Sequence, residues 1–222
     1  MVAPVDPRPQ GSERTRVRRL PEKAVSDRAA LDRVLDEGLV AHVGIADRDP
    51  PFVMPCGYAR DGDRLLLHGS TGSRLFRALA AGQPACVTVT ILDGLVVARS
   101  LFESSMHYRS AVVLGRGHSL VGADKRHALD VLADALLPGR RADARPPSRR
   151  ELAATMVVAV PLAEWSVKVS DSPPDVAPED AEWTPTPWSG IVPLRLNAGT
   201  PVTDSGGEPP DYVTRWYDGS AR

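Results

Sequence analysis

The sequence has very little cysteine, with two residues in a chain of 222. So few thiols exclude a disulfide framework and a zinc site built from cysteines. No apolar run approaches the ~20 residues that a membrane-spanning helix needs, and residues 1–20 lack the apolar stretch of a secretory signal. A basic excess is also missing, since 27 Lys and Arg face 28 Asp and Glu. We therefore expect a cytoplasmic protein with neither a membrane nor a nucleic acid as its partner.

Composition divides the chain into three regions. Residues 1–22 carry prolines and arginines but few large apolar groups, so we expect a disordered or loosely docked arm. Residues 23–170 alternate apolar runs with turn signals and should hold the fold. Residues 171–222 are rich in proline and acidic residues, yet they contain three tryptophans, which is too much aromatic surface for a linker. This predicts an irregular C-terminal extension that packs partly on the core, with residues 188–196 as its best-ordered piece.

The pattern of the central region is that of an antiparallel sheet. Asp-Gly pairs at 61–62 and 93–94 lie between apolar runs and predict hairpins. Helices are inserted where apolar residues recur every three or four positions, the first of them between a Ser26 cap and a terminating Gly38. Hairpin order leaves no room for the long crossovers of a parallel sheet, so the pattern predicts an α+β fold closed into a small barrel. The expected strands are 39–46, 51–59, 64–68, 85–92, 95–100, 108–115, 155–161 and 164–170, and the expected helices are 27–37, 75–81 and 123–137.

One stretch between a strand and a helix is the best candidate for binding chemistry. Residues 68–74, HGSTGSR, combine two glycines, three hydroxyl side chains and Arg74. Glycine lets the backbone approach a ligand closely, unpaired N–H groups at a helix start attract anions, and the planar guanidinium suits phosphate oxygens. These features predict a phosphate site, and a capped helix start that binds nothing is an equal alternative. The stretch is not a P-loop, because no Gly-Lys-Ser/Thr follows.

The segment LHGSTGSRLFRALAAGQPACVTVTILDGLVVARS, continued by SMHYRSAVVLGRG, resembles the pyridoxamine 5′-phosphate oxidase-like family of flavin-binding split-barrel proteins. It is most similar to the subgroup that includes nitroimidazole-resistance-type reductases, and the resemblance covers residues 26–170. It implies an antiparallel split β-barrel with inserted helices and, here, an irregular C-terminal extension. It also implies a homodimer with FMN bound in two clefts at the dimer interface.

The resemblance further implies three segments that contact the flavin. One is a loop that holds the FMN phosphate, the second is a strand whose backbone lies along the isoalloxazine ring, and the third approaches the flavin from the other chain or from the far side of the cleft. His68, which ends a strand beside the loop, is expected near the cofactor or, alternatively, as a structural histidine. The matching residues are, in that order, Ser70, Thr71, Ser73 and Arg74; Met54, Pro55 and Cys56; and Tyr108, Arg109 and Ser110.

The chain departs from the family's true oxidases in its cations. Those enzymes carry an Arg and a Lys on the strand that here spans residues 52–58, and a Lys where this chain has Leu75. Fewer cations remain to bind a phosphorylated substrate. The resemblance therefore implies flavin binding more firmly than turnover of pyridoxamine phosphate.

These observations predict an FMN-dependent oxidoreductase that exchanges a hydride with a nicotinamide donor, NAD(P)H, or a small organic substrate. No catalytic side chain can be named, as expected where a cofactor supplies the chemistry. No histidine pair has ligand spacing with a carboxylate, so no metal site is expected. Two alternatives stay open: a flavin-binding carrier or sensor, and the same barrel using heme or a deazaflavin. Heme would need an axial ligand, and the candidates are His42, His68 and His107.

Overall fold

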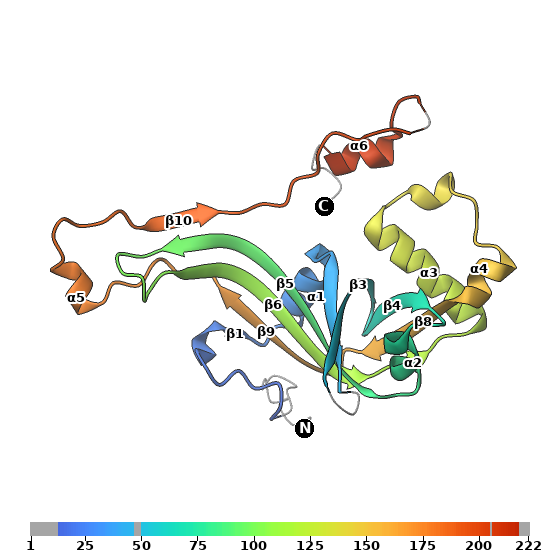
Figure 1. Ribbon diagram of the computed structural model, residues 1–222, viewed down its shortest axis with the longest axis horizontal. Coiled ribbons are helices and arrows are strands. Elements are labelled where there is room, and N and C mark those ends of the chain that lie inside the picture. The colour runs from blue at the N-terminus through green and yellow to red at the C-terminus, as the bar shows by residue number, and fades with distance from the viewer. Residues whose placement is uncertain (1–12, 47–49, 205, 218–222) are drawn as a thin grey trace, which may run out of the picture.

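The computed structural model describes residues 13–46, 50–204 and 206–217 (Figure 1). Its strands are β1 (Ala24–Val25), β2 (Val40–Ile45), β3 (Phe52–Asp61), β4 (Arg64–Ser70), β5 (Pro84–Val97), β6 (Ser105–Arg116), β7 (His118–Ser119), β8 (Thr155–Pro161), β9 (Glu164–Ser170) and β10 (Gly190–Pro193). Its helices are α1 (Arg28–Glu37), α2 (Arg74–Ala80), α3 (Gly122–Leu136), α4 (Arg149–Ala154), α5 (Pro178–Ala181) and α6 (Asp211–Tyr217), with short 3-10 turns η1 (Pro21–Lys23) and η2 (Arg140–Ala142).

The strands pair antiparallel in the order β1-β9-β6-β5-β2-β3-β4-β8-β7, and β10 pairs with β5. The sheet curls on itself, because inward residues of β4 and β8 share one hydrophobic cluster with those of β2, β5 and β6. The predicted α+β class with an antiparallel sheet is confirmed, and the arrangement is that of a split barrel. Among the described residues, no helix combines the length and the apolar character needed to span a bilayer.

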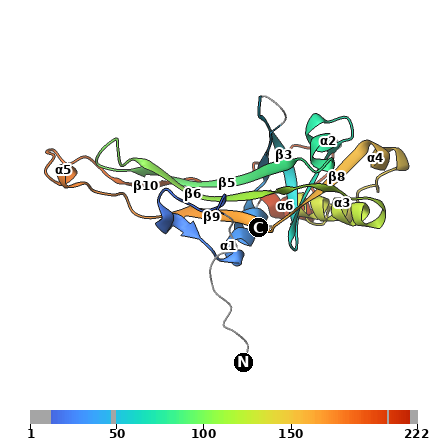
Figure 2. The same ribbon diagram turned by 90° about the horizontal axis from the view of Figure 1, so that it is seen from below.

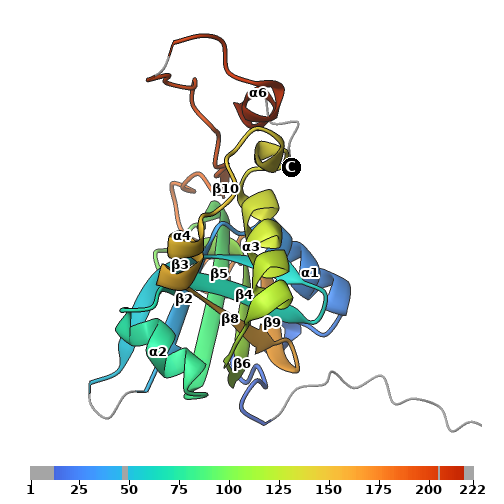
Figure 3. The same ribbon diagram turned by 90° about the vertical axis from the view of Figure 1, so that its right-hand side faces the viewer.

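Two hydrophobic clusters lie on opposite faces of β4 and β8. The first fills the barrel, with Leu65 and Leu67 of β4 packed against α1 and α2. The second lies outside the barrel, where Leu66 of β4 meets Ala128 and Leu132 of α3. Helix α3 crosses the outer face of β3, β4 and β8 (Figure 3). Burial on both faces explains why three consecutive leucines form one strand.

Helix α1 begins one residue later than predicted. Asp27, and not Ser26, is the cap, since its Oδ1 accepts a hydrogen bond from the Ala29 amide at 3.1 Å. Gly38 ends the helix as expected, but its φ of −70° is not left-handed. The glycine is needed for space instead, because a Cβ there would lie 2.4 Å from Val89 Cγ1 and 2.6 Å from Tyr58 Oη.

The hairpin predicted at Asp93-Gly94 is wrong. Strand β5 continues through this pair to Val97 with a bulge between Leu92 and Gly94. Two long-range contacts hold the bulge: Arg109 binds the Asp93 carboxylate, and β10 pairs with the end of β5. The hairpin predicted at Asp61-Gly62 is confirmed, with Gly62 at φ +57° between β3 and β4.

Beyond the barrel, β5 and β6 extend together as a long arm, with β10 alongside (Figure 2). We define this arm as residues 92–107. Its tip is open to solvent, since Leu101 and Phe102 are 97% and 91% exposed. The chain after β9 runs outward along the arm, returns as β10, and reaches α6 near the end of α3 (Figure 1).

The division into three regions stays a prediction. Residues 1–12 of the expected N-terminal arm lie outside the described residues. The described part of that arm, residues 13–22, lies alongside β9. There Arg14 pairs with Glu164, and Lys168 donates a hydrogen bond to the Arg19 carbonyl. In the C-terminal extension, the stretch expected to be best ordered contains β10.

Candidate functional site

Strand β4 presents two kinds of side chain on its outer face. Leu65 and Leu67 point into the barrel, so Leu66, His68 and Ser70 point outward, because successive side chains of a strand alternate. Helix α3 covers Leu66. His68 and Ser70 follow Leu66 on this face, about 7 Å apart along the strand. The two predicted site residues of β4 therefore share one face.

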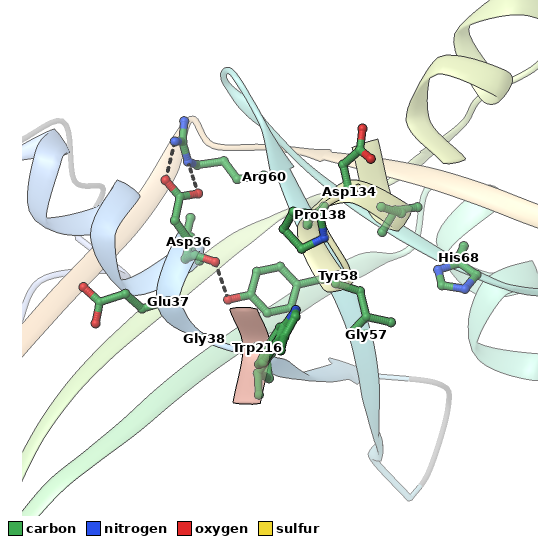
Figure 4. A pocket seen from close by; sticks show the side chains of 16 residues that line it. Asp36, Glu37, Gly38, Gly57, Tyr58, Arg60, His68, Asp134, Pro138 and Trp216 are labelled. Carbon is green, nitrogen blue, oxygen red and sulfur yellow. Dashed lines mark hydrogen bonds and ion pairs between the residues drawn. The ribbon is translucent and has the colours of Figure 1, made fainter. Parts of the chain in front are cut away.

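His68 lines a pocket of about 430 Å³ between the barrel and the helices α1, α3 and α6. This volume lies within the range of small-molecule sites. Figure 4 shows His68 and Gly57 on the barrel side and Pro138 and Trp216 on the helix side. Most of the lining is apolar or aromatic, with charged groups at the rim. The lining residues are Leu35, Asp36, Glu37, Gly38, Leu39, Gly57, Tyr58, Ala59, Arg60, His68, Leu132, Asp134, Ala135, Leu136, Pro138 and Trp216.

A glycine keeps the barrel side of this pocket open. Tyr58 of β3 pairs with Leu67 of β4, so Gly57 lies beside His68. A Cβ at Gly57 would meet no atom within 4 Å, so packing does not require a glycine there. The space is available to a ligand that rests against β3 next to the imidazole.

His68 is exposed on the outer face of β4, yet the protein around its imidazole removes part of the hydration that the charged form needs. This desolvation lowers the pKa of the imidazole, because the charged form loses hydration. His68 is therefore neutral at neutral pH. A neutral imidazole has a nitrogen lone pair that can ligate a metal centre or accept a hydrogen bond.

The carboxylates at the pocket rim are each paired with an arginine. Asp36 accepts two hydrogen bonds from Arg60, at 2.8 and 2.5 Å, and these hydrogen bonds raise the pKa of the guanidinium. Glu37 accepts from Arg109, and Asp134 lies 3.2 Å from the Arg141 guanidinium. The rim is thus a ring of neutralised pairs around an apolar interior.

The loop from Ser70 to Arg74 differs from its prediction in one respect. Its backbone N–H groups are occupied: Thr71 donates to the Ala154 carbonyl, Gly72 to Ser70 Oγ and Ser73 to the Ser70 carbonyl, at 3.0 to 3.1 Å. Helix α2 has only seven residues. Any phosphate held here must therefore be held by side chains more than by amides or a helix dipole.

Two side chains of this loop are suited to that role. Ser73 makes no side-chain capping bond to α2. Arg74 is exposed and lies over the ring of Phe52, 4.8 Å from its centroid. Since Phe52 begins β3, this cation–π contact joins the loop to the strand expected to follow the flavin ring.

The residues of β3 that are expected near the flavin point to the two opposite faces of the strand in turn. Pro55 lies on the outer face of β3 with Gly57, whereas Cys56 points toward the barrel and packs against its core. Burial raises the pKa of the Cys56 thiol, so it stays protonated at neutral pH. Met54 is 39% exposed near the start of the strand. These three residues pair with β2, since β3 pairs with β4 only over Tyr58–Asp61, and the contact of Arg74 with Phe52 is what joins this part of β3 to the loop.

The third expected segment is not brought to the same place within one chain. Tyr108, Arg109 and Ser110 lie on β6, and β5 and β2 separate that strand from β3. Three strand spacings amount to about 14 Å. Arg109 is already engaged by Asp93, at 2.8 and 2.9 Å, and by Glu37. The ion pairs of Arg109 thus connect β6 to the bulge of β5 and to α1.

The other two histidines considered as heme ligands lie elsewhere. His42 is exposed on β2, and the His107 Nε2 lies 2.7 Å from the Ser172 carbonyl oxygen. Neither lines the pocket. Within the described parts of the chain, no three His, Cys, Asp or Glu side chains gather closely enough to hold a metal ion.

Sequence reasoning missed Trp216, the helix-side wall of the pocket. Its presence in the extension was visible, but nothing local indicates where a helix at the end of an irregular segment will dock. The helix predicted over residues 123–137 matches α3, but its place in the pocket wall was not predicted, since periodicity identifies a helix and not its neighbours.

Comparison with known proteins supplies independent findings. The family model for pyridoxamine 5′-phosphate oxidase matches residues 27–169. A search of curated proteins finds no match. Among solved structures, the FAD and heme binding protein from Mycobacterium smegmatis is 43% identical, with a TM-score of 0.83, over 88% of this chain and 97% of that one.

Two further solved structures are similar. The flavocytochrome Anf3 from Azotobacter vinelandii is 36% identical, with a TM-score of 0.85, over 96% of this chain and 99% of that one. Coverage of this extent includes most of the C-terminal extension. A protein described as a 5-nitroimidazole antibiotic resistance protein from Bacteroides thetaiotaomicron is 23% identical, with a TM-score of 0.56, over 66% of this chain and 86% of that one, and this likeness shows the fold alone.

Proposed function

The chain belongs to the pyridoxamine 5′-phosphate oxidase family, and from that premise we propose that it is a flavin-dependent oxidoreductase that also binds heme. Two relatives support the pair of cofactors. The protein from Mycobacterium smegmatis, 43% identical, is described as binding FAD and heme. The relative from Azotobacter vinelandii, 36% identical, is described as a flavocytochrome.

One observation carries the proposal: His68 and Ser70 share the outer face of β4. His68 lies in an apolar pocket, and Ser70 opens the loop that resembles a flavin-phosphate site. The strand separates them by about 7 Å. Two cofactors bound at these positions would be neighbours, so electrons could pass between them without a mobile carrier.

The pocket residues fit a heme. A heme needs an apolar site and an axial ligand, and His68 is the imidazole that lines this pocket. The lowered pKa of His68 keeps it in the ligating neutral form. Gly57 leaves space beside it, and Leu132, Leu136 and Trp216 would pack on the porphyrin. Bound heme would supply single-electron transfer.

The loop and β3 fit a flavin. The hydroxyls of Ser70, Thr71 and Ser73 and the Arg74 guanidinium would hold its phosphate, and the outer face of β3 around Pro55 would lie along the ring. Bound flavin would supply hydride chemistry. The sequence predicts FMN, but we now favour FAD because the 43% identical relative is described as an FAD binder.

We also propose that the protein is a homodimer. Tyr108 and Ser110 lie too far across the sheet to reach a flavin held by the loop of their own chain. A second copy would bring them to the cleft. The small-molecule substrate, NAD(P)H as donor and the cytoplasmic location stay predictions from the sequence.

The test is the absorption spectrum of the purified protein, followed by chromatography of the extracted cofactors. We expect two flavin bands, a Soret band and FAD in the extract. His68→Ala should lose the Soret band and keep the flavin, whereas His42→Ala and His107→Ala should keep both. If His68→Ala retains the Soret band and another histidine variant loses it, the pocket assignment is wrong.

A second arm of the same experiment separates an enzyme from a carrier or sensor. NAD(P)H is added without oxygen, and the flavin bands are followed. An oxidoreductase that uses this donor bleaches them within the time of a catalytic cycle. A carrier or sensor leaves them unchanged.

A further inference from the structure

Helix α6 closes one side of the pocket that contains His68. Trp216, in the last turn of this helix, lines the pocket opposite the barrel (Figure 4). The other lining residues end with Pro138, so a segment more than 70 residues further along supplies this wall. Helix α6 also lies beyond residues 27–169, which the family model matches. The pocket is therefore completed by a separate, late element of the chain.

Tyr212 is the buried side chain that fastens α6 to the turn after α3. Tyr212 is 9% exposed, and its hydroxyl accepts a hydrogen bond from Arg140 Nη1 at 2.7 Å and donates one to Asp143 Oδ2 at 2.8 Å. Its Cβ packs on Gly139, where an added Cβ would lie only 3.1 Å away and φ is +94°. We call Tyr212, Gly139, Arg140 and Asp143 the latch.

The segment that leads to α6 does little to hold it. Residues 194–204 and 206–210 form no helix or strand, and nearly all of them are exposed. Gly206 and Gly207 both have positive φ, at +72° and +93°. Elements joined by exposed, irregular chain and held by few buried contacts open most readily. The position of α6 therefore depends on the latch and on Trp216.

We propose that α6 is a lid on this pocket, that Trp216 is the positioning residue which packs on a flat aromatic ligand, and that the latch sets how often the lid opens. The half-buried indole of Trp216 offers a large apolar face for such packing. The nature of the ligand, a porphyrin, rests on the proposed function. The movement of the lid does not, because the latch and the tether exist without a ligand.

A lid makes a kinetic prediction that a fixed wall does not. When ligand must wait for α6 to open, weakening the latch speeds both entry and release, and the affinity changes less than either rate. A fixed wall that lost contacts would speed release alone. The variant is Tyr212→Phe, which keeps the ring on Gly139 and loses both hydrogen bonds. The matched control is Trp183→Phe, which alters a 66% exposed aromatic of the same extension.

The first readout needs no heme. Hydrogen–deuterium exchange of the α6 amides is compared with that of β4 and β8 in the heme-free full-length protein. We expect α6 to exchange through local opening, and Tyr212→Phe to speed it by roughly 5- to 150-fold, the ratio for the loss of two hydrogen bonds. The amides of β4 and β8 should not change, and Trp183→Phe should match the wild type.

The second readout is heme exchange, measured as entry of free hemin and as transfer to excess apomyoglobin. Tyr212→Phe should speed both by a similar factor. Trp216→Ala should speed release further, and Trp216→Phe should restore part of the retention. If α6 exchanges only together with β4, or if Tyr212→Phe speeds its exchange while both heme rates stay unchanged, the lid is contradicted. A protein that takes up no heme would contradict the proposed function, while the amide exchange and the entry of an apolar dye still decide the lid.

Discussion

At the scale of single side chains, Arg74 is the residue on which the proposed flavin site depends most. It is exposed, lies over the Phe52 ring, and matches the family's phosphate loop. A hydrogen bond to a charged group contributes about 1.5–3 kcal/mol. Arg74→Ala should therefore weaken flavin binding by roughly 10- to 150-fold, measured by calorimetric titration of flavin-free protein.

The matched control for this variant is Arg77→Ala, which removes an exposed arginine from the same helix three residues later. Arg77→Ala should leave the flavin affinity unchanged. Equal losses in the two variants would mean that the positive charge of α2 matters in general, and that Arg74 does not contact a phosphate.

His68 makes a prediction about pH. Its pKa is lower in the folded protein than the ordinary value of 6.5, so the unfolded chain binds more protons as the pH falls through that range. The free energy of unfolding should therefore decrease as the pH falls below about 6.5, down to the folded pKa. Urea unfolding of heme-free protein at pH 7.5 and pH 5.5 measures this change.

In the His68→Gln variant the decrease should be smaller, because this titrating group is gone. An identical decrease in His68→Gln and the wild type would show that His68 titrates as it does in water.

At the scale of elements, two glycines next to the pocket are present for different reasons. A Cβ at Gly38 would lie 2.4 Å from Val89 Cγ1, whereas one at Gly57 would meet nothing within 4 Å. Gly38→Ala should cost about 1–3 kcal/mol of unfolding free energy, as overpacked sites do. Gly57→Ala should cost nothing and should lower the affinity for heme, because the methyl group enters the ligand's space.

Thermal unfolding and hemin titration of both variants make the comparison. A Gly57→Ala protein that binds heme as tightly as the wild type would place the porphyrin away from β3. A Gly38→Ala protein of unchanged stability would mean that α1 can shift away from Val89 without loss.

The elements that the sequence predicts well are those whose signals are local. The strands expected at 155–161 and 164–170 have the observed bounds of β8 and β9, since alternation and the intervening turn are contained within them. The helix ending at Gly38 is also found. The bulge at Asp93 was interpreted as a hairpin, because its partners Arg109 and β10 lie 16 and about 100 residues away.

At the candidate site, too, the local features were predictable from the sequence and the long-range contacts were not. The loop from Ser70 to Arg74 is visible from its residue types and its family resemblance. Its occupied amides are not, because the acceptor for Thr71 is the carbonyl of Ala154. The pocket itself could not be predicted, since it forms where α3 and α6 meet the barrel and neither helix carries a signal for its docking partner.

At the scale of the whole molecule, the proposed flavin cleft needs a second copy of the chain. Ser110 lies on the outer face of β6, opposite Thr90 and Lys168, where a second copy would complete the flavin cleft. Ser110→Arg should lower the dimer fraction and the flavin content together, measured by analytical ultracentrifugation with detection of flavin absorbance. Ser119→Arg, an exposed change on β7, should alter neither.

A monomeric Ser110→Arg protein with full flavin content would show that one chain is sufficient for the cofactor. A wild-type protein that sediments as a monomer at all concentrations would exclude the interface cleft altogether. In both cases Tyr108 and Ser110 would have no part in flavin binding.

The central claim is that flavin and heme bind as neighbours on one face of β4, and the flavin fluorescence lifetime tests it most directly. The lifetime is measured in the protein with both cofactors, in heme-free protein, and in His68→Ala mixed with the same amount of hemin. Adjacent sites predict strong quenching by heme in the wild type and the heme-free lifetime in His68→Ala. A lifetime that does not change when the wild-type protein takes up heme would contradict the account.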